Sequence, residues 1–120
     1  MPSTTSSTKH MTPHEAICDA AHRMIQGLDD NNAELLSSAF TPDATYDLRA
    51  FSFLGFDQVL SGQANIVSTL LSAVGHMDTT HMLSNFRTRI LEAGTGEGEG
   101  DGGKAEMECY ALAQHWRTGE

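Results

Sequence analysis

The chain has 120 residues, of which 16 are acidic and 7 are basic, so its formal net charge is −9. A chain of this length builds one domain with a single core. Its acidity argues against nucleic acid and anionic membranes as partners, because both attract basic surfaces. The N-terminus lacks a secretory apolar run, and no segment approaches the roughly 18 apolar residues of a membrane span. We therefore expect a soluble, cytoplasmic protein with neither nucleic-acid nor membrane partners.

The first predicted element is a long amphipathic helix that follows a polar tail. Residues 1–11 are rich in Ser and Thr and are expected to be disordered, which leaves one domain over residues 12–120. Thr12 is a favourable N-cap, Pro13 suits the first helical turn, and Glu15 completes a capping box. Apolar residues then recur at helical spacing as far as the segment LDDNN, where the helix is expected to end.

Shorter elements are predicted in the middle of the chain. A second helix over about 32–40 ends at the segment TPD, because proline cannot continue a helix. Residues 44–51 alternate enough to form a strand, whereas the apolar run 52–60 fits more than one structure. A third helix is expected over about 62–74, with Ser61 as its cap.

Two long strands are predicted to complete the domain. They cover about residues 79–92 and 104–118, and the glycine-rich segment 93–103 joins them as a hairpin loop. Helices followed by antiparallel strands indicate an α+β domain, with the helices packed on one curved sheet. The concave side of such a sheet is a natural place for a small-molecule pocket.

Two histidines fall on the strand faces that are expected to line this pocket, because side chains alternate between the faces of a strand. The first strand places on one face His81, Leu83 and Asn85. The second places on one face a set of small or soft residues that ends in a histidine: Met107, Cys109, Ala111, Ala113 and His115. At the end of the first helix, Asp29 and Asp30 are both candidates for a carboxylate in the same pocket.

This combination of side chains favours proton-transfer chemistry. A carboxylate fixes the tautomer of a neighbouring imidazole and makes it a general base, and a second histidine can serve as the acid. Two histidines and one carboxylate are also the ligand set of some iron sites. A local metal site of His76, Asp78 and His81 is a further, weaker alternative.

The remaining histidines and both cysteines are expected to have no role in the chemistry. His10, His14 and His22 are predicted to be exposed. Cys18 and Cys109 have no CxxC spacing and are predicted to be reduced, buried thiols. A nucleophilic mechanism is not favoured, because no GxSxG motif is present and Cys109 has no obvious activating base beyond the histidine on its own strand.

Four segments resemble the SnoaL-like branch of the NTF2-like superfamily, and their pattern is most similar to its scytalone dehydratase-like members. The segments are GLDDNNAELLSSAFTPDATYD (27–47), LSGQANIVSTLL (60–71), DTTHMLSNFRTRI (78–90) and AEMECYALAQHWRTG (105–119). The resemblance implies a cone-shaped α+β fold, in which three helices wrap a strongly bent sheet around a deep pocket. It assigns the family's carboxylate to Asp29 and its two pocket histidines to His81 and His115. Two tyrosines that orient water in the dehydratases are replaced here by Leu28 and Leu48.

The resemblance implies a cofactor-free lyase or isomerase of secondary metabolism. Its reaction would be a dehydration, a double-bond shift or a cyclisation of a small, mostly apolar, oxygenated substrate of polyketide or terpenoid type. In this hypothesis His81 is the base, Asp29 orients it, and His115 is the acid or oxyanion partner. The expected substrate-binding residues are Tyr46, Asn85, Met107, Cys109 and Ala111. The alternative is a non-catalytic module for ligand binding or dimerisation.

The C-terminus differs from the family pattern. NTF2-like domains normally continue after the second long strand with two further strands, whereas this sequence stops at RTGE. An incomplete sheet exposes an edge that invites pairing with another chain. We therefore expect a homodimer, in which shared or exchanged strands are one way to complete the sheet. Dimerisation through the outer face of the sheet, as is usual in the family, is the other way.

Overall fold

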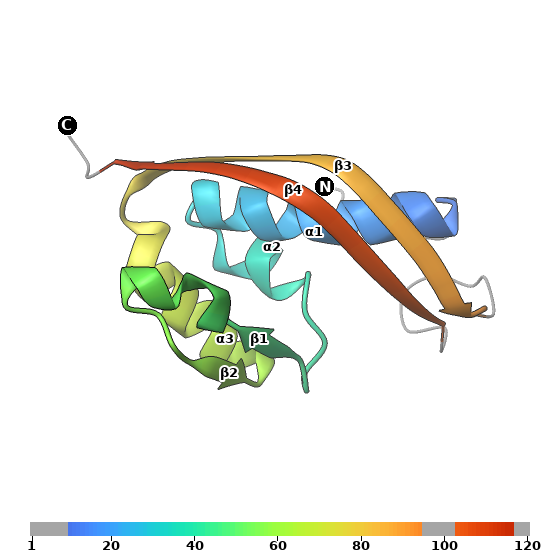
Figure 1. Cartoon of the computed structure of the whole chain (residues 1–120), viewed down its shortest axis with the longest axis horizontal. Coiled ribbons are helices and arrows are strands. Elements are labelled where there is room, and N and C mark those ends of the chain that lie inside the picture. Colours follow the sequence, from blue (N-terminus) through green and yellow to red (C-terminus); the bar gives the residue numbers. More distant parts are fainter. Residues whose placement is uncertain (1–9, 95–102, 117–120) are drawn as a thin grey trace.

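A computed structural model describes residues 10–94 and 103–116 of the chain. Its elements, in chain order, are α1 (Pro13–Asp29), α2 (Ala33–Ser37), β1 (Thr45–Asp47), the 3-10 helix η1 (Arg49–Leu54), β2 (Val59–Ser61), α3 (Gln63–Leu70), the π-helical turn η2 (Leu71–Gly75), β3 (Asp78–Glu92) and β4 (Lys104–Trp116). Two antiparallel pairs form, β1 with β2 and β3 with β4. The arched β3–β4 hairpin covers α1, and α2, α3 and the short β1–β2 pair lie beyond that helix (Figure 1). The predicted α+β class and the helices packed on a curved antiparallel sheet are confirmed.

Parts of three predicted segments lie outside the described residues. They are most of the N-terminal tail, most of the glycine-rich loop and the end of the second long strand. The extents of the tail and of the domain therefore stay predictions.

Helix α1 begins as the sequence indicates. The Thr12 hydroxyl accepts a hydrogen bond from the backbone N–H of Glu15 at 3.1 Å. The Glu15 carboxylate accepts one from the backbone N–H of Thr12 at 3.3 Å. These reciprocal bonds satisfy two N–H groups that the first helical turn leaves without backbone partners. The predicted capping box is confirmed.

Two local predictions between the helices are wrong. The strand expected over 44–51 ends at Asp47. The Asp47 carboxylate accepts a hydrogen bond from the backbone N–H of Arg49 at 2.9 Å, and this bond closes a turn. The following residues form η1 in place of a longer strand. Ser61 does not cap the third helix, since it is the last residue of β2; Gly62 holds the N-cap position with a φ of 89°, which favours glycine.

The β3–β4 hairpin contains a bulge that changes which side chains face inward. His81 pairs with Ala113 and Ser84 with Tyr110, but the next paired residue of β3 is Arg87. Asn85 takes the left-handed conformation, with a φ of 58°, and is exposed. A bulge inserts a residue into one strand and shifts the alternation beyond it. The prediction that Asn85 shares a face with His81 is therefore wrong.

The hydrophobic core lies between the helices and β2. Its buried members come from α1, α2, β2 and α3: Leu28, Leu36, Leu60, Ile66 and Leu70. Gly27 allows α1 and α2 to approach closely, because a Cβ atom there would lie 2.6 Å from the backbone nitrogen of Leu36. The core thus fixes the C-terminal end of α1, where Asp29 is located.

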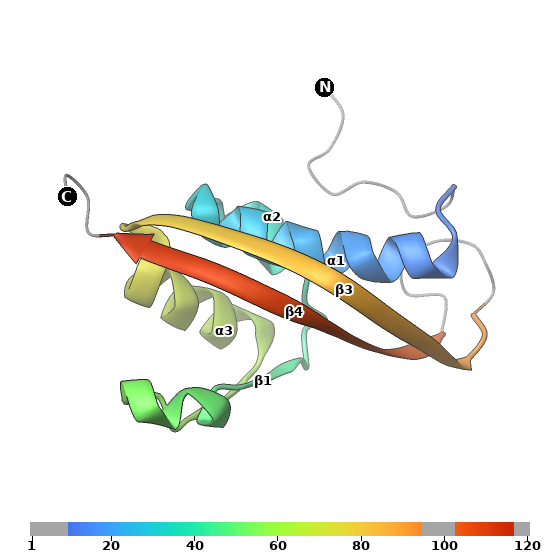
Figure 2. The same ribbon diagram turned by 45° about the horizontal axis from the view of Figure 1, so that its top comes forward.

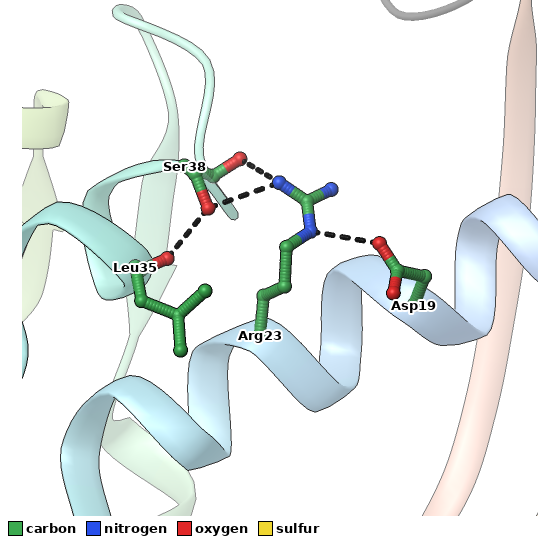
Figure 3. Close-up of polar contacts among 4 residues, drawn as sticks. All are labelled: Asp19, Arg23, Leu35 and Ser38. Atoms are coloured by element: carbon green, nitrogen blue, oxygen red, sulfur yellow. Dashed lines mark hydrogen bonds and ion pairs between the residues drawn. The ribbon is translucent and has the colours of Figure 1, made fainter. Parts of the chain in front are cut away.

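A buried arginine reinforces the α1–α2 contact (Figure 3). Arg23 Nε donates to Asp19 Oδ2 at 2.9 Å, within α1. Its Nη1 donates to the carbonyl of Ser38 at 2.6 Å and to the Ser38 hydroxyl at 3.0 Å, just after α2. Arg23 is 7% exposed, so these partners compensate the desolvation of its charge.

Candidate active site

Asp29 joins the end of α1 to the start of β3. Its Oδ1 lies 2.6 Å from His81 Nδ1 and accepts a hydrogen bond from the Thr79 hydroxyl at 2.8 Å. Its Oδ2 accepts the backbone N–H of His81 at 3.2 Å. The side chains of His81 and Asp29 are 13% and 20% exposed. Three donors from one strand therefore hold this carboxylate in place.

His115 extends the contact across the hairpin. Its Nε2 lies 3.2 Å from His81 Nε2, and the two ring centroids are 5.1 Å apart. The strand register explains this proximity, since Thr79 pairs with His115 and His81 pairs with Ala113. Side chains from α1, β3 and β4 thus form one continuous chain of polar contacts, from Asp29 through His81 to His115.

The two short contacts of His81 decide where its proton lies. Asp29 is acceptor-only when ionised, so His81 Nδ1 carries the hydrogen that lies between them. In neutral His81 the Nε2 atom is then a lone-pair acceptor. His115 Nε2, at 3.2 Å, must in that state be the donor. The arrangement therefore offers one basic nitrogen and one donor N–H side by side.

The structure brings together Asp29, His81 and His115 but spreads the predicted substrate-binding residues. Tyr46 packs edge-on against Phe40 beside the core, and burial raises the pKa of the Tyr46 hydroxyl. Among the others, Met107 and Cys109 are half-buried, whereas Asn85 and Ala111 are exposed. Within the described residues, none of these five side chains forms a hydrogen bond with Asp29, His81 or His115.

Two surface hollows lie over the hairpin near the bulge. One, of about 330 Å³, is lined by Asn85, Phe86, Arg87, Glu108, Cys109 and Tyr110. The other, of about 510 Å³, is lined by Arg87, Thr88, Arg89, Glu106, Met107 and Glu108. Both include residues from the two faces of the hairpin and neither includes the Asp–His–His chain.

Sequence reasoning missed Thr79 as part of the site. The signal was present, because Thr79 precedes His81 by two positions and so lies on the same face of β3. The expectation that His22 is exposed is also wrong. Its ring is half-buried and packs edge-on against Phe86, with centroids 5.3 Å apart.

Within residues 10–94 and 103–116, no three His, Cys, Asp or Glu side chains are grouped as a metal ion would require. The alternative metal site at His76, Asp78 and His81 therefore does not form. No helix within the same ranges has both the length and the apolarity to cross a membrane.

Comparison with known proteins identifies related sequences. The model of the SnoaL-like domain family matches residues 9–120. A curated relative, terrestric acid biosynthesis cluster protein E of Penicillium crustosum, is 34% identical over 116 residues. The match covers 96% of this chain and 64% of the relative, so the chain spans slightly less than two thirds of that protein. No solved structure matches significantly.

Proposed function

This chain belongs to the family of SnoaL-like domains within the NTF2-like superfamily, and on that premise we propose that it catalyses proton transfer in secondary metabolism. The substrate class is a small, mostly apolar, oxygenated molecule of polyketide or terpenoid type. The name of the curated relative, a biosynthesis cluster protein, supports a pathway of this kind. The observation that carries the proposal is the 2.6 Å contact between Asp29 and His81, extended by His115.

In the proposed reaction the two histidines act on one substrate. His81 Nε2 removes a proton from carbon, while Asp29 holds the ring and balances the positive charge that develops on it. His115 Nε2–H donates a proton to the substrate oxygen. In a dehydration this oxygen leaves as water, and in a double-bond shift it becomes the hydroxyl of an enol. A cyclisation would use the same pair of transfers. Thr79 acts as a positioning residue through its hydrogen bond to Asp29.

We propose that the substrate lies along the inner side of β4. Small side chains at Ala111 and Ala113 leave space beside His115, and Met107 and Cys109 continue the same side toward the bulge. Tyr46 would donate a hydrogen bond as a neutral phenol, since burial raises its pKa.

The test is exchange of carbon-bound hydrogen in deuterated water. Candidate hydroxylated ketones of polyketide and terpenoid type are incubated with the purified chain, and deuterium uptake and product formation are followed by mass spectrometry. We expect His81→Ala to lower both rates by about 10²–10⁴-fold, the usual contribution of a general base. His76→Ala is the matched control, because His76 is exposed and follows η2, outside the Asp–His–His chain. Equal rates in wild type and His81→Ala would overturn the assignment.

A second candidate function is a non-catalytic module for ligand binding or dimerisation. Exposure favours it: the side chains of Ala111, Ala113 and His115 are all exposed on the inner side of β4. An open site excludes water poorly, which weakens proton-transfer catalysis. Tight binding of a compound that takes up no deuterium, in wild type and His81→Ala alike, would favour this function over catalysis.

We further propose that the chain forms a homodimer.

A further inference from the structure

Helix α1 lies alongside β3 and runs antiparallel to it (Figure 2). Three contacts between the two elements mark the register: His14 Nδ1 to Thr88 Oγ1 at 2.8 Å, the His22 and Phe86 ring centroids at 5.3 Å, and Asp29 to His81 at 2.6 Å. Cys18 follows His14 by four residues and precedes His22 by four. Residues four apart share a helix face, so Cys18 faces the hairpin between the first two contacts.

Cys109 occupies the matching position on β4. Its neighbour Glu108 pairs with Arg87, and its other neighbour Tyr110 pairs with Ser84, so Cys109 lies opposite the bulge. Both thiols are half-buried. Burial raises the pKa of Cys18, and the proximity of Cys109 raises it further. The register of α1, β3 and β4 therefore places the two cysteines, which are 91 positions apart in the sequence (109 − 18), at the same level of the helix–hairpin contact.

Cys18 has a base that the sequence does not reveal. His14 Nε2 lies 3.5 Å from Cys18 Sγ, while the other ring nitrogen of His14 contacts Thr88 Oγ1 at 2.8 Å. When Nδ1 donates its hydrogen to the threonine hydroxyl, Nε2 presents a lone pair to the thiol. Because burial raises the pKa of Cys18, its thiol needs such a base to lose its proton, and Thr88 in turn orients the base.

We propose that Cys18 and Cys109 form a thiol–disulfide exchange site for low-molecular-weight disulfides, in which Cys18 attacks and Cys109 resolves. The Cys18 proton passes to His14, and the thiolate attacks one sulfur of the reagent. A mixed disulfide forms, and the first reagent thiolate leaves and takes up a proton. Cys109 then attacks the Cys18 sulfur of the mixed disulfide and displaces the second reagent thiolate. The Cys109 proton passes to that thiolate. The two protein sulfurs lose two electrons in total, and the reagent disulfide is reduced to two thiols.

The resulting Cys18–Cys109 disulfide would link α1 covalently to β4. These two elements carry the outer members of the Asp–His–His chain, Asp29 and His115. Cys109 also lies on the proposed substrate side of β4, but neither cysteine forms a hydrogen bond with Asp29, His81 or His115 among the described residues, and the tests below follow mass and not catalysis. These tests therefore do not depend on the proposed function.

The first experiment follows the intact mass of the native chain in excess oxidised glutathione. The chain has only two cysteines, so every product is identified by its mass. We expect one transient glutathione adduct, followed by a product that lacks two hydrogens and carries no glutathione. Accumulation of a chain with two stable adducts would overturn the proposal, and so would a chain that stays unmodified while the unfolded chain reacts.

Variants then separate the roles. Cys109→Ser is expected to stop at the single adduct on Cys18, and Cys18→Ser to lose the rapid first step. His14→Gln is expected to slow that step by at least about tenfold, because it removes the base but keeps the helix. His22→Gln is the matched control on the same helix face and is expected to react at the wild-type rate. Circular dichroism confirms that each variant is folded. An unchanged rate in folded His14→Gln would contradict the assigned base.

Discussion

Thr79 tests how far the site depends on the placement of one carboxylate. Its hydroxyl donates to Asp29 Oδ1 at 2.8 Å, the same atom that contacts His81. We predict that Thr79→Val, which keeps the side-chain shape, lowers deuterium exchange about tenfold, because a hydrogen bond to a charged group contributes about 1.5–3 kcal/mol. The measurement is the exchange rate on the best substrate of the screen.

The neighbouring threonine supplies the control for this prediction. Thr80 is exposed on the opposite face of β3, so Thr80→Val makes the same chemical change away from Asp29. Its exchange rate is expected to match the wild type. Equal losses in the two variants would mean that the effect arises from the strand and not from the hydrogen bond to Asp29.

At the scale of elements, the buried guanidinium between α1 and α2 is expected to contribute strongly to stability. Arg23→Met removes the ion pair with Asp19 and both hydrogen bonds to Ser38. We predict a loss of about 2–4 kcal/mol in the free energy of unfolding, since breaking buried, hydrogen-bonded charge pairs has costs of this order. Urea denaturation measures it.

An exposed arginine gives the comparison. Arg87 pairs with Glu108 at 3.4 Å, but its side chain is 81% exposed. Arg87→Met should therefore change the free energy of unfolding by less than about 1 kcal/mol. A loss for Arg23→Met as small as that for Arg87→Met would show that the α1–α2 contact does not depend on the buried charge.

The elements differ in how well the sequence predicts them. The capping box at Thr12 and the alternation that places His81 near His115 depend on short-range rules, and these predictions agree with the structure. The strand end at Asp47 depends on one side-chain hydrogen bond, and the bulge at Asn85 on one inserted residue. Neither leaves a periodic signal. Contacts between His22 and the hairpin arise only once α1 has packed, so no local pattern predicts them.

At the scale of the whole molecule, an apolar outer face on the hairpin bears on the proposed dimer. Its large side chains are each more than half exposed: Met82 (56%), Tyr110 (70%), Leu112 (59%) and Trp116 (54%). Exposed apolar patches of this kind mark association surfaces. We predict a dimer in sedimentation equilibrium, and a shift toward monomer for Leu112→Lys.

The control for the dimer prediction lies on the same strand face. Gln114→Lys adds the same charge two residues further along β4, at a position that is already polar. It is expected to weaken the dimer much less than Leu112→Lys. A wild-type chain that sediments as a monomer at every concentration would contradict the prediction.

In the proposed mechanism, Asp29 fixes the tautomer of His81 and leaves Nε2 as the base. Nitrogen NMR of the histidine rings tests it without a substrate, at mildly alkaline pH where imidazoles are generally neutral. We predict a protonated Nδ1 and an unprotonated Nε2 in His81, a protonated Nε2 in His115, and loss of this fixed pattern in Asp29→Asn. A His81 ring that carries its hydrogen on Nε2, or that keeps its pattern in Asp29→Asn, would contradict the account.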